Sequence, residues 1–342
     1  MVALRWLHLT DLHQGNKLGE HLWPTTKAAF FDDLEKLHAK TGPWDLILFT
    51  GDLTQSGQQF DEVDPILDDI QAKVQALGSP EVKLLAVPGN HDLYRPDKNK
   101  PAVVLLQEWN ERSDVRREFW NDPNSEYWQI VTEAFANYSD WWKTRSADLD
   151  TMTYGLLPGD FSFWLEKDGY KFGFVGLNTA FLQLTDQVSE GELALDVRQF
   201  NEACGGDGPE WCDRGAANVL MTHHPRSWLN EESLDYLAHE IQVHRRFALH
   251  LCGHMHETAY QQLAEAGEAS HRLWQGRSLF GLEYFGENQV RSHGYAVGEM
   301  SIAENQRGYF VIWPRTRSSR GELIPDQDRI KLTEDNHTER AY

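Results

Sequence analysis

An apolar run that stops at Pro88-Gly89 and is followed by Asn90, His91 and Asp92 constrains this chain more than any other feature. Residues 84–87 predict a short buried strand, and the Pro-Gly pair ends it. Side chains suited to metal and phosphate chemistry therefore follow the carboxyl end of a strand, the edge at which open α/β sheets bind ligands. Taken alone, the stretch is equally typical of an ordinary turn, because Asn and Gly are common turn residues.

Four further apolar runs end in the same way. Helical patterns over 26–40 and 63–77 separate the first three runs, which indicates parallel strands joined by crossover helices. The carboxyl ends of such strands meet at one sheet edge, so the polar residues that follow them converge there. The runs and their polar residues are 4–9 with Asp11 and His13, 45–49 with Asp52, 217–221 with His223 and His224, and 247–252 with His254 and His256.

This combination of carboxylates and imidazoles predicts a metal site. Each residue alone has an ordinary explanation, but their shared position after apolar strands is improbable without a shared purpose. Asp and His ligands suit divalent ions such as Mn²⁺, Zn²⁺ and Fe, and the lack of cysteine ligands argues against a structural zinc cage. One residue separates Asp11 from His13 and His254 from His256, so on extended loops both members of each pair face the same side.

Together the motifs resemble those of the calcineurin-like metallophosphoesterases over about residues 3–313. The resemblance implies a four-layer α/β/β/α sandwich that carries two metal ions at the strand ends. It also implies that His91 contacts the phosphate and protonates the leaving oxygen. The motifs are Asp11-Leu12-His13, Gly51-Asp52, Gly89-Asn90-His91-Asp92, His223-His224-Pro225 and Gly253-His254-Met255-His256. The implied ligands are Asp11, His13 and His256 for one metal, Asn90, His223 and His254 for the other, and Asp52 as the bridge.

General chemistry agrees with these roles. Two cations roughly 3.5–4 Å apart can clamp a phosphoryl group, and a water that bridges them becomes a hydroxide near neutral pH. We expect two divalent transition-metal ions, Mn²⁺ before Fe or Zn²⁺. His91 can donate a proton near pH 7, although a supporting hydrogen-bond role is the alternative. Arg95, His224 and Arg226 are candidate phosphate contacts, although exposed arginines are more often simply solvated.

Two segments stand outside the strand pattern. Residues 95–159 predict a helical insertion rich in tryptophan, which we interpret mainly as hydrophobic core and secondarily as a cap able to stack bases. From residue 314 the chain turns polar, so we divide it into a catalytic domain over 1–313 and a mobile tail or linker over 314–342, a possible connection to a partner or fused domain. Strands of a second sheet are expected around 277–280, 294–301 and 308–313.

Charge and composition narrow the setting. The chain has 53 acidic and 32 basic residues, a net charge of −21 that opposes nonspecific binding to long duplex DNA or anionic membranes. No apolar run approaches the ~18 residues that span a bilayer, and no targeting signal precedes the first strand. These features predict a cytoplasmic protein without membrane contact. Three cysteines without regular spacing fit a reducing compartment, with a bridge between Cys204 and Cys212 as a minor alternative.

These observations predict a phosphodiesterase or nuclease that acts on a nucleotide or a short single-stranded nucleic acid. The alternatives are a phosphomonoesterase, including one acting on phosphoproteins, and a non-catalytic scaffold that uses the fold for binding. The scaffold is disfavoured because every expected ligand is present, although fold alone does not establish activity. The sequence does not indicate the oligomeric state.

Overall fold

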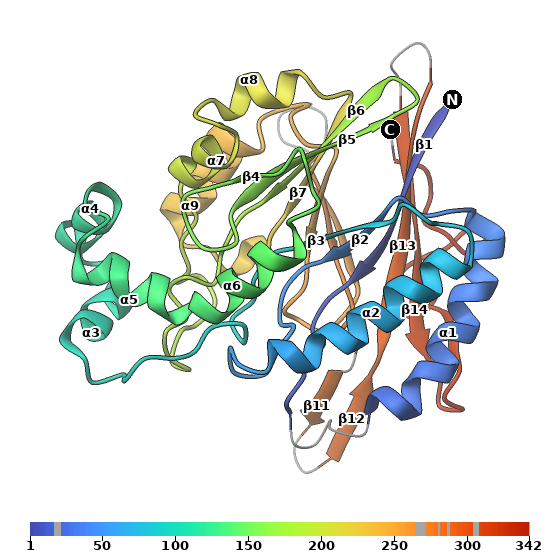
Figure 1. Cartoon of the computed structure of the whole chain (residues 1–342), viewed down its shortest axis with the longest axis horizontal. Helices are drawn as coiled ribbons and strands as arrows, with labels where there is room; N and C mark the ends of the chain where they lie inside the picture. Colours follow the sequence, from blue (N-terminus) through green and yellow to red (C-terminus); the bar gives the residue numbers. More distant parts are fainter. Residues whose placement is uncertain (17–21, 264–270, 280, 286–287, 304–307, 342) are drawn as a thin grey trace.

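The computed structural model describes residues 1–16, 22–263, 271–279, 281–285, 288–303 and 308–341. Two large sheets dominate this part of the chain (Figure 1). The first sheet contains, in spatial order, β15 (Leu323–Pro325), β14 (Gly308–Arg317), β13 (Gly294–Ile302), β1 (Val2–Leu9), β2 (Leu46–Phe49) and β3 (Lys83–Ala86). The second contains β4 (Thr153–Tyr154), β5 (Phe161–Lys167), β6 (Tyr170–Gly176), β7 (Ala217–Met221), β8 (Leu249–Cys252), β10 (His271–Gln275) and β9 (Ala259–Leu263). A separate hairpin pairs β11 (Gly281–Phe285) with β12 (Asn288–Ser292).

Helices cover the outer face of each sheet. Crossover helices α1 (Leu22–Thr41) and α2 (Phe60–Ala76) join the parallel strands β1, β2 and β3 and lie along the first sheet (Figure 1). The second sheet is covered by α7 (Val197–Ala203), α8 (Gly208–Asp213) and α9 (Glu231–Tyr236), which is followed by the single π-turn η2 (Leu237–Ile241). The apolar face of α2 is buried, as its period of three and four residues predicts. The predicted α/β/β/α sandwich is therefore confirmed.

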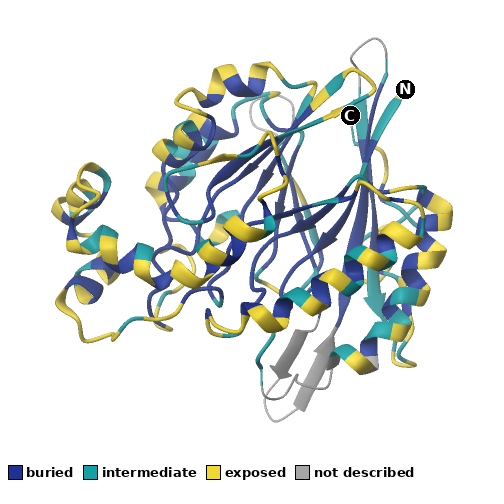
Figure 2. Ribbon diagram, in the orientation of Figure 1, coloured by how far each residue is buried: buried dark blue, intermediate teal, exposed yellow. Residues whose placement is uncertain are grey.

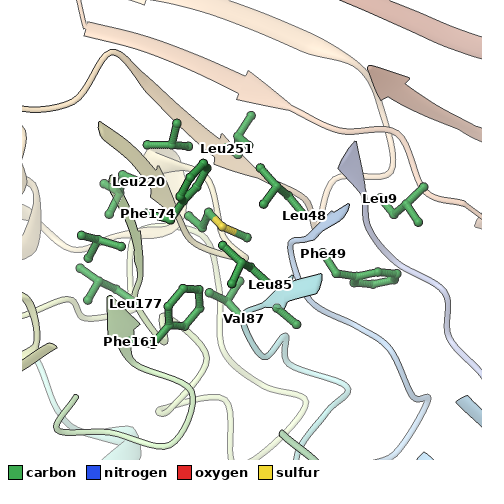
Figure 3. Packing of buried hydrophobic residues seen from close by; sticks show 14 of the residues in the cluster. Leu9, Leu48, Phe49, Leu85, Val87, Phe161, Phe174, Leu177, Leu220 and Leu251 are labelled. Atoms are coloured by element: carbon green, nitrogen blue, oxygen red, sulfur yellow. The ribbon is translucent and has the colours of Figure 1, made fainter. Parts of the chain in front are cut away.

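The hydrophobic core lies between the two sheets. Figure 3 shows Leu48 and Leu85 of the first sheet close to Phe174, Leu220 and Leu251 of the second. The central strands are largely buried (Figure 2). Strands β2 and β8 are buried along their whole length, which explains the continuous apolar run of β2; in β8 the buried His250 interrupts the apolar residues. This packing fixes the ends of the central strands relative to one another, so the loops that leave those ends are held on a rigid base.

Two of the predicted second-sheet strands belong to the first sheet, so that part of the prediction is wrong. β13 lies antiparallel beside β1, from Val2 opposite Ile302 to His8 opposite Ala296, and β14 lies beside β13. Residues 277–279 form no strand, and Phe280 lies outside the described residues. The apolar pattern identifies a strand but not its neighbour, since either sheet buries such a strand equally well.

The polar segment after Trp313 is folded against the first sheet rather than extended as a mobile tail. β14 continues through Pro314 to Arg317, and β15 pairs with its end. Farther on, Asp326 is fully buried and accepts a hydrogen bond from Arg277 at 3.1 Å, while Ala341 forms a bridge with Phe310. Composition misled the prediction because backbone hydrogen bonds and the buried ion pairs Arg277–Asp326 and Arg315–Asp33 hold this segment, with few apolar side chains.

The segment 95–159 forms four helices between β3 and β4: α3 (Pro101–Gln107), α4 (Ser113–Asn121), α5 (Glu126–Ala134) and α6 (Ala136–Arg145). Its tryptophans pack mainly inward. Trp109, Trp141 and Trp142 are buried, and the indole N–H of Trp141 donates to Asp64 of α2 at 2.8 Å. The arrangement supports the core interpretation for these three side chains over a base-stacking surface.

Two expectations about compartment can be compared with the structure. No helix among the described residues has the length and apolar composition needed to cross a bilayer. Cys204, Cys212 and Cys252 are buried free thiols, so Cys204 and Cys212 form no bridge. Burial raises the pKa of each thiol, which keeps all three protonated and unreactive near neutral pH.

Candidate metal centre

The loops after β1, β2, β3, β7 and β8 bring their polar side chains into one cluster. One group of ligand atoms, which we call subsite 1, comes from Asp11, His13 and His256. The Nε2 atoms of His13 and His256 are 3.2 Å apart, and Asp11 Oδ1 lies 3.4 Å from His256 Nε2. Asp11 Oδ1 is buried and accepts no hydrogen bond in the described structure, so its lone pairs are available to a cation.

A second group, subsite 2, is formed by Asn90, His223 and His254. Asn90 Oδ1 lies 3.0 Å from His223 Nε2 and 3.0 Å from His254 Nδ1, and these two nitrogens are 3.3 Å apart. His223 Nδ1 donates to the carbonyl oxygen of Thr50 at 2.7 Å, which leaves the Nε2 lone pair directed into the subsite when the ring is neutral. Three converging donor atoms of this kind can hold a divalent transition-metal ion.

Asp52 lies between the two subsites. Its Oδ2 is 3.3 Å from His223 Nε2 of subsite 2 and 3.8 Å from His13 Nε2 of subsite 1. Its Oδ1 accepts the backbone N–H of His91 at 2.7 Å. One carboxylate therefore faces both groups of ligands while its second oxygen is held by the loop after β3.

The loops turn sharply instead of running extended as expected. Five of the candidate ligands have positive φ angles, between 51° and 72°: Asp11, His13, Asp52, His254 and His256. L-residues adopt this left-handed region at a cost, and such strain collects at functional sites where the surrounding structure enforces it. Asp11 and His13 still face one cluster, as do His254 and His256. They do so because the backbone turns at these residues, and not because it is extended.

Three motif glycines are needed because the ligands pack against them. A Cβ atom on Gly89 would lie 2.1 Å from Asp52 Oδ1, and one on Gly51 would lie 2.4 Å from His223 Nδ1. At Gly253 a Cβ atom would meet Thr10 Oγ1 at 2.0 Å. The glycines of these motifs thus make room for metal ligands on the neighbouring loops.

Replacing Gly89 with alanine should displace Asp52 and weaken metal binding. We expect roughly 1–3 kcal/mol of lost stability from overpacking and about 10- to 100-fold weaker metal affinity from the displaced carboxylate. Chemical denaturation and metal titration measure the two effects. Gly191→Ala is the control for metal affinity, because a Cβ atom on Gly191 would meet nothing within 4 Å; its φ of 84°, which Gly89 does not share, means that this control also loses some stability through backbone strain. Equal metal affinity in both variants would contradict this account.

Burial and mutual charge set the protonation of the cluster. Burial opposes ionisation of Asp11 and Asp52, but neighbouring histidines outweigh it and hold the pKa of Asp11 at about 2 and that of Asp52 well below its usual range. Burial lowers the pKa of His13 to about 4 and that of His254 to about 3, so both rings are neutral. For His223, burial is outweighed by Asp52 and Asp11, which raise its pKa to about 9.

Metal binding should therefore release a proton from His223. Below pH 9 the metal-free ring is mostly charged, whereas a ligand must be neutral, so affinity should rise with pH up to about 9. Calorimetric titration of the metal-free protein with Mn²⁺ at pH 7, in buffers of different ionisation enthalpy, should show proton release to which His223 contributes about one proton per chain. A His223→Gln variant, which has no such proton, should release about one proton fewer, because the water activated by the two ions loses its proton in both proteins. Equal proton release by both proteins would assign the proton to another group.

His91 and Asp92 hold the loop after β3 in place. The His91 Nδ1–H donates to the carbonyl oxygen of Gln55 at 2.9 Å, which leaves Nε2 as the nitrogen available for proton exchange. Asp92 is fully buried and accepts the backbone N–H groups of Thr54 and Gly89, each at 2.9 Å. Burial raises its pKa to about 7. Sequence reasoning assigned Asp92 no role, although its place in the Gly-Asn-His-Asp motif was the available signal.

The three predicted substrate contacts have different surroundings. His224 is buried beside the cluster, with its ring centre 4.4 Å from that of His254 and its Nδ1 2.9 Å from Thr179 Oγ1. Arg226 lies in the short helix η1 (Arg226–Trp228). Burial, and after it the charge of Arg226, lower the pKa of His250 in β8 to about 3. Arg95 is exposed. The structure thus brings His224 to the ligand cluster.

Trp228 and Met255 adjoin the cluster and were missed. The Trp228 ring lies 4.2 Å from the His254 ring in an edge-to-face arrangement, and its indole N–H points to the Met255 sulfur at 3.3 Å. Met255 is 43% exposed, unusually high for a methionine. Met255 was detectable as the spacer of the Gly-His-x-His motif, whereas Trp228 carries no sequence signal.

Comparisons with known proteins identify the family of this chain. The family model of the calcineurin-like phosphoesterases matches residues 4–258. Among solved structures, a dimetal phosphatase from Danio rerio is similar at 13% identity, with 94% of this chain and 98% of that chain covered and a TM-score of 0.43. A purple acid phosphatase from yellow lupin matches at 13% identity over 94% of this chain and 53% of that one, with a TM-score of 0.47. A search of curated proteins finds no match. The family match covers most of the sequence, and the chain therefore belongs to the calcineurin-like phosphoesterase family.

Proposed function

We propose that this protein is a phosphodiesterase that uses two divalent transition-metal ions, Mn²⁺ before Fe or Zn²⁺, to cleave a nucleotide or a short nucleic acid. The observation that carries the proposal is the pair of three-residue subsites joined by Asp52. Asp11, His13 and His256 would hold one ion, Asn90, His223 and His254 would hold the other, and Asp52 would bridge them. When bound, the two ions neutralise phosphate charge and activate a water for attack.

His91 is suited to act as the general acid. Its backbone N–H is bonded to Asp52, and its ring lies 4.8 Å from that of His13, so the imidazole stands beside subsite 1 and Asp52. The ring is partly exposed, unlike most ligand side chains, so a bound ester can reach it. Because Nδ1 is engaged with Gln55, Nε2 would deliver the proton to the leaving oxygen.

The charges around the ligands favour a diester over a monoester. Among the described residues, the charged groups with the largest effects on the pKa values of the ligand side chains are histidines and aspartates. No lysine or arginine of the described chain has an effect of that size. A phosphomonoester carries two negative charges and is commonly bound with help from guanidinium groups. A diester carries one, which two divalent metal ions can balance without a further cationic side chain.

Trp228 and Met255 offer an apolar wall for the second ester group. They adjoin His254 of subsite 2, and Met255 separates the ligands His254 and His256. An aromatic ring and a thioether suit a nucleoside, because bases stack on aromatic side chains and thioether sulfur packs well against rings. This wall supports an organic diester over a small monoester as substrate.

The Mn²⁺-loaded protein should hydrolyse bis-p-nitrophenyl phosphate and thymidine 5′-p-nitrophenyl phosphate faster than p-nitrophenyl phosphate. The expected order follows from the single charge of a diester and from the apolar wall. Initial rates measured at equal substrate concentration test it, with cyclic nucleotides and single-stranded DNA as further substrates. Cleavage of the monoester alone would overturn the proposal in favour of a phosphomonoesterase.

Trp228→Ala should raise KM for thymidine 5′-p-nitrophenyl phosphate about tenfold, since stacking on an aromatic ring contributes roughly 1–3 kcal/mol per base. KM for methyl p-nitrophenyl phosphate, which has no large second group, should change little. Trp23→Ala is the control, because Trp23 packs on Phe31 within α1 and donates to Asp69 of α2. An equal change for both substrates would mean that Trp228 only supports His254.

A further inference from the structure

A pocket with a cavity volume of about 140 Å³, partly open to solvent, lies outside the metal centre. Helix α4, the loop before α7, and α9 form its walls. Its lining includes three arginines and three large aromatic side chains, namely Arg116, Arg117, Arg198, Trp109, Trp120 and Tyr236. This volume is smaller than the roughly 300–1,000 Å³ typical of sites that enclose a drug-sized ligand, so a ligand the size of a nucleotide would fill the pocket and extend through its open side into solvent.

Two of the arginines are held in fixed positions. Arg116 Nη1 donates to the carbonyl oxygens of Trp109 at 2.7 Å and Asn110 at 2.9 Å. The Arg198 guanidinium bonds Asp196 at 2.9 Å and lies over the Trp120 ring, 5.7 Å from its centre. Guanidinium groups held in this way lose little side-chain entropy when they bind a phosphate, because their orientation is already set.

The pocket is locally basic in a strongly acidic protein. Asp196 and Glu232 are the acidic residues among its lining side chains, and they face Arg198 and Arg116, respectively. Arg117 is exposed at the pocket and adds a third positive charge. The pocket lining thus has three guanidinium groups and two carboxylates, although the whole chain has a net charge of −21. This local excess of positive charge favours binding of an anion.

Hydrogen bonds connect the pocket to the metal centre. Leu193, next to the lining residue Ala194, donates to the carbonyl oxygen of Trp228 at 2.9 Å and accepts from the N–H of Asn230 at 2.8 Å. The Asn230 side chain donates to Asn110 of the helical insertion at 2.7 Å and also caps α9. A change in the pocket walls can therefore reach Trp228, which lies against His254.

We infer that this pocket binds the terminal phosphate and the base of a nucleotide, either as a free mononucleotide or as the phosphorylated end of a short single strand. The arginines recognise the phosphate through charge-assisted hydrogen bonds, and the partly exposed Trp120 and Tyr236 contact the base. Ligand binding in the pocket then changes the position of Trp228 through the hydrogen bonds of Leu193 and Asn230. Ligand binding itself needs no metal and does not depend on the reaction assigned to the metal centre.

Calorimetric titration of the full chain in EDTA, which keeps nucleotides from binding through metal ions, tests the site directly. The probes are AMP, adenosine, inorganic phosphate, and a three-nucleotide DNA with or without a 5′ phosphate. AMP should bind more tightly than adenosine or phosphate alone. Tighter binding of the phosphorylated trinucleotide than of AMP would identify a nucleic-acid end as the ligand, and the reverse order would identify a free nucleotide.

Arg117→Ala should weaken AMP binding at least about tenfold, as expected for one charged hydrogen bond. Arg112→Ala is the matched control, because Arg112 precedes the same helix α4 but pairs with Asp114 outside the pocket lining. Arg198→Ala, which removes a second pocket charge, should have an effect like that of Arg117→Ala. Absence of AMP and trinucleotide binding, or equal affinity in the Arg117 and Arg112 variants, would overturn the inference. Bis-p-nitrophenyl phosphate turnover tests the metal centre independently of either result.

Discussion

Asp52→Asn is expected to lower phosphodiester turnover by at least about 10³-fold, equivalent to roughly 4 kcal/mol of transition-state stabilisation. Asp52 Oδ2 faces His223 and His13, one from each subsite, and the carboxylate is ionised in the folded protein. An amide removes the negative charge and presents only one oxygen. The variant should lose affinity for metal as well as activity, because two cations held close together repel each other without the bridging charge.

Metal analysis and kinetics on the same preparation test this expectation. After reconstitution with Mn²⁺ the unmodified protein should contain about two ions per chain, and Asp52→Asn should contain fewer. Asp69→Asn is the control, since Asp69 of α2 forms a surface ion pair with Lys27 of α1. A fully loaded Asp52→Asn protein that retains a tenth or more of the activity would show that Asp52 does not bridge the ions.

The architecture of the candidate site was predictable because strand ends determine it. Apolar runs identified the strands, and the α/β pattern requires parallel strands to present their carboxyl ends at one edge. Asp11, Asp52 and Asn90 therefore had to be neighbours if 4–9, 45–49 and 84–87 were adjacent strands. The register confirms that adjacency, with Leu9 opposite Phe49 and Phe49 opposite Ala86.

Other features were not predictable, because they depend on contacts between distant segments. Apolar alternation in 294–302 could not reveal that β13 pairs with β1. The segment after Trp313 folds through backbone hydrogen bonds and the buried Asp326, and polar composition gives no sign of either. Trp228 reaches His254 only because η1 follows β7 in a turn whose direction the sequence does not specify. The positive φ of five candidate ligands also follows from tertiary packing.

His91→Ala is expected to keep both metal ions while lowering the turnover of a nucleoside diester by about 10²–10⁴-fold, the usual contribution of a general acid. His91 Nδ1 is bonded to Gln55, and His91 belongs to neither three-residue subsite, although its ring is near His13 and Asp52. Its loss should leave the six subsite ligands and Asp52 in place. The effect should depend on the leaving group. An alkoxide leaves with difficulty unless it is protonated, whereas p-nitrophenolate leaves readily without a proton.

The comparison of two leaving groups separates acid catalysis from a structural role. Thymidine 5′-p-nitrophenyl phosphate supplies the activated leaving group, and a thymidine dinucleotide supplies the alkoxide. If His91 donates the proton, kcat for the nitrophenyl ester divided by kcat for the dinucleotide should be about 10- to 100-fold higher in His91→Ala than in the unmodified protein. His239→Ala, at an exposed position near the end of α9, should leave the ratio unchanged. Loss of activity by the same factor on both substrates would mean that His91 orients Asp52 through the loop rather than donating a proton.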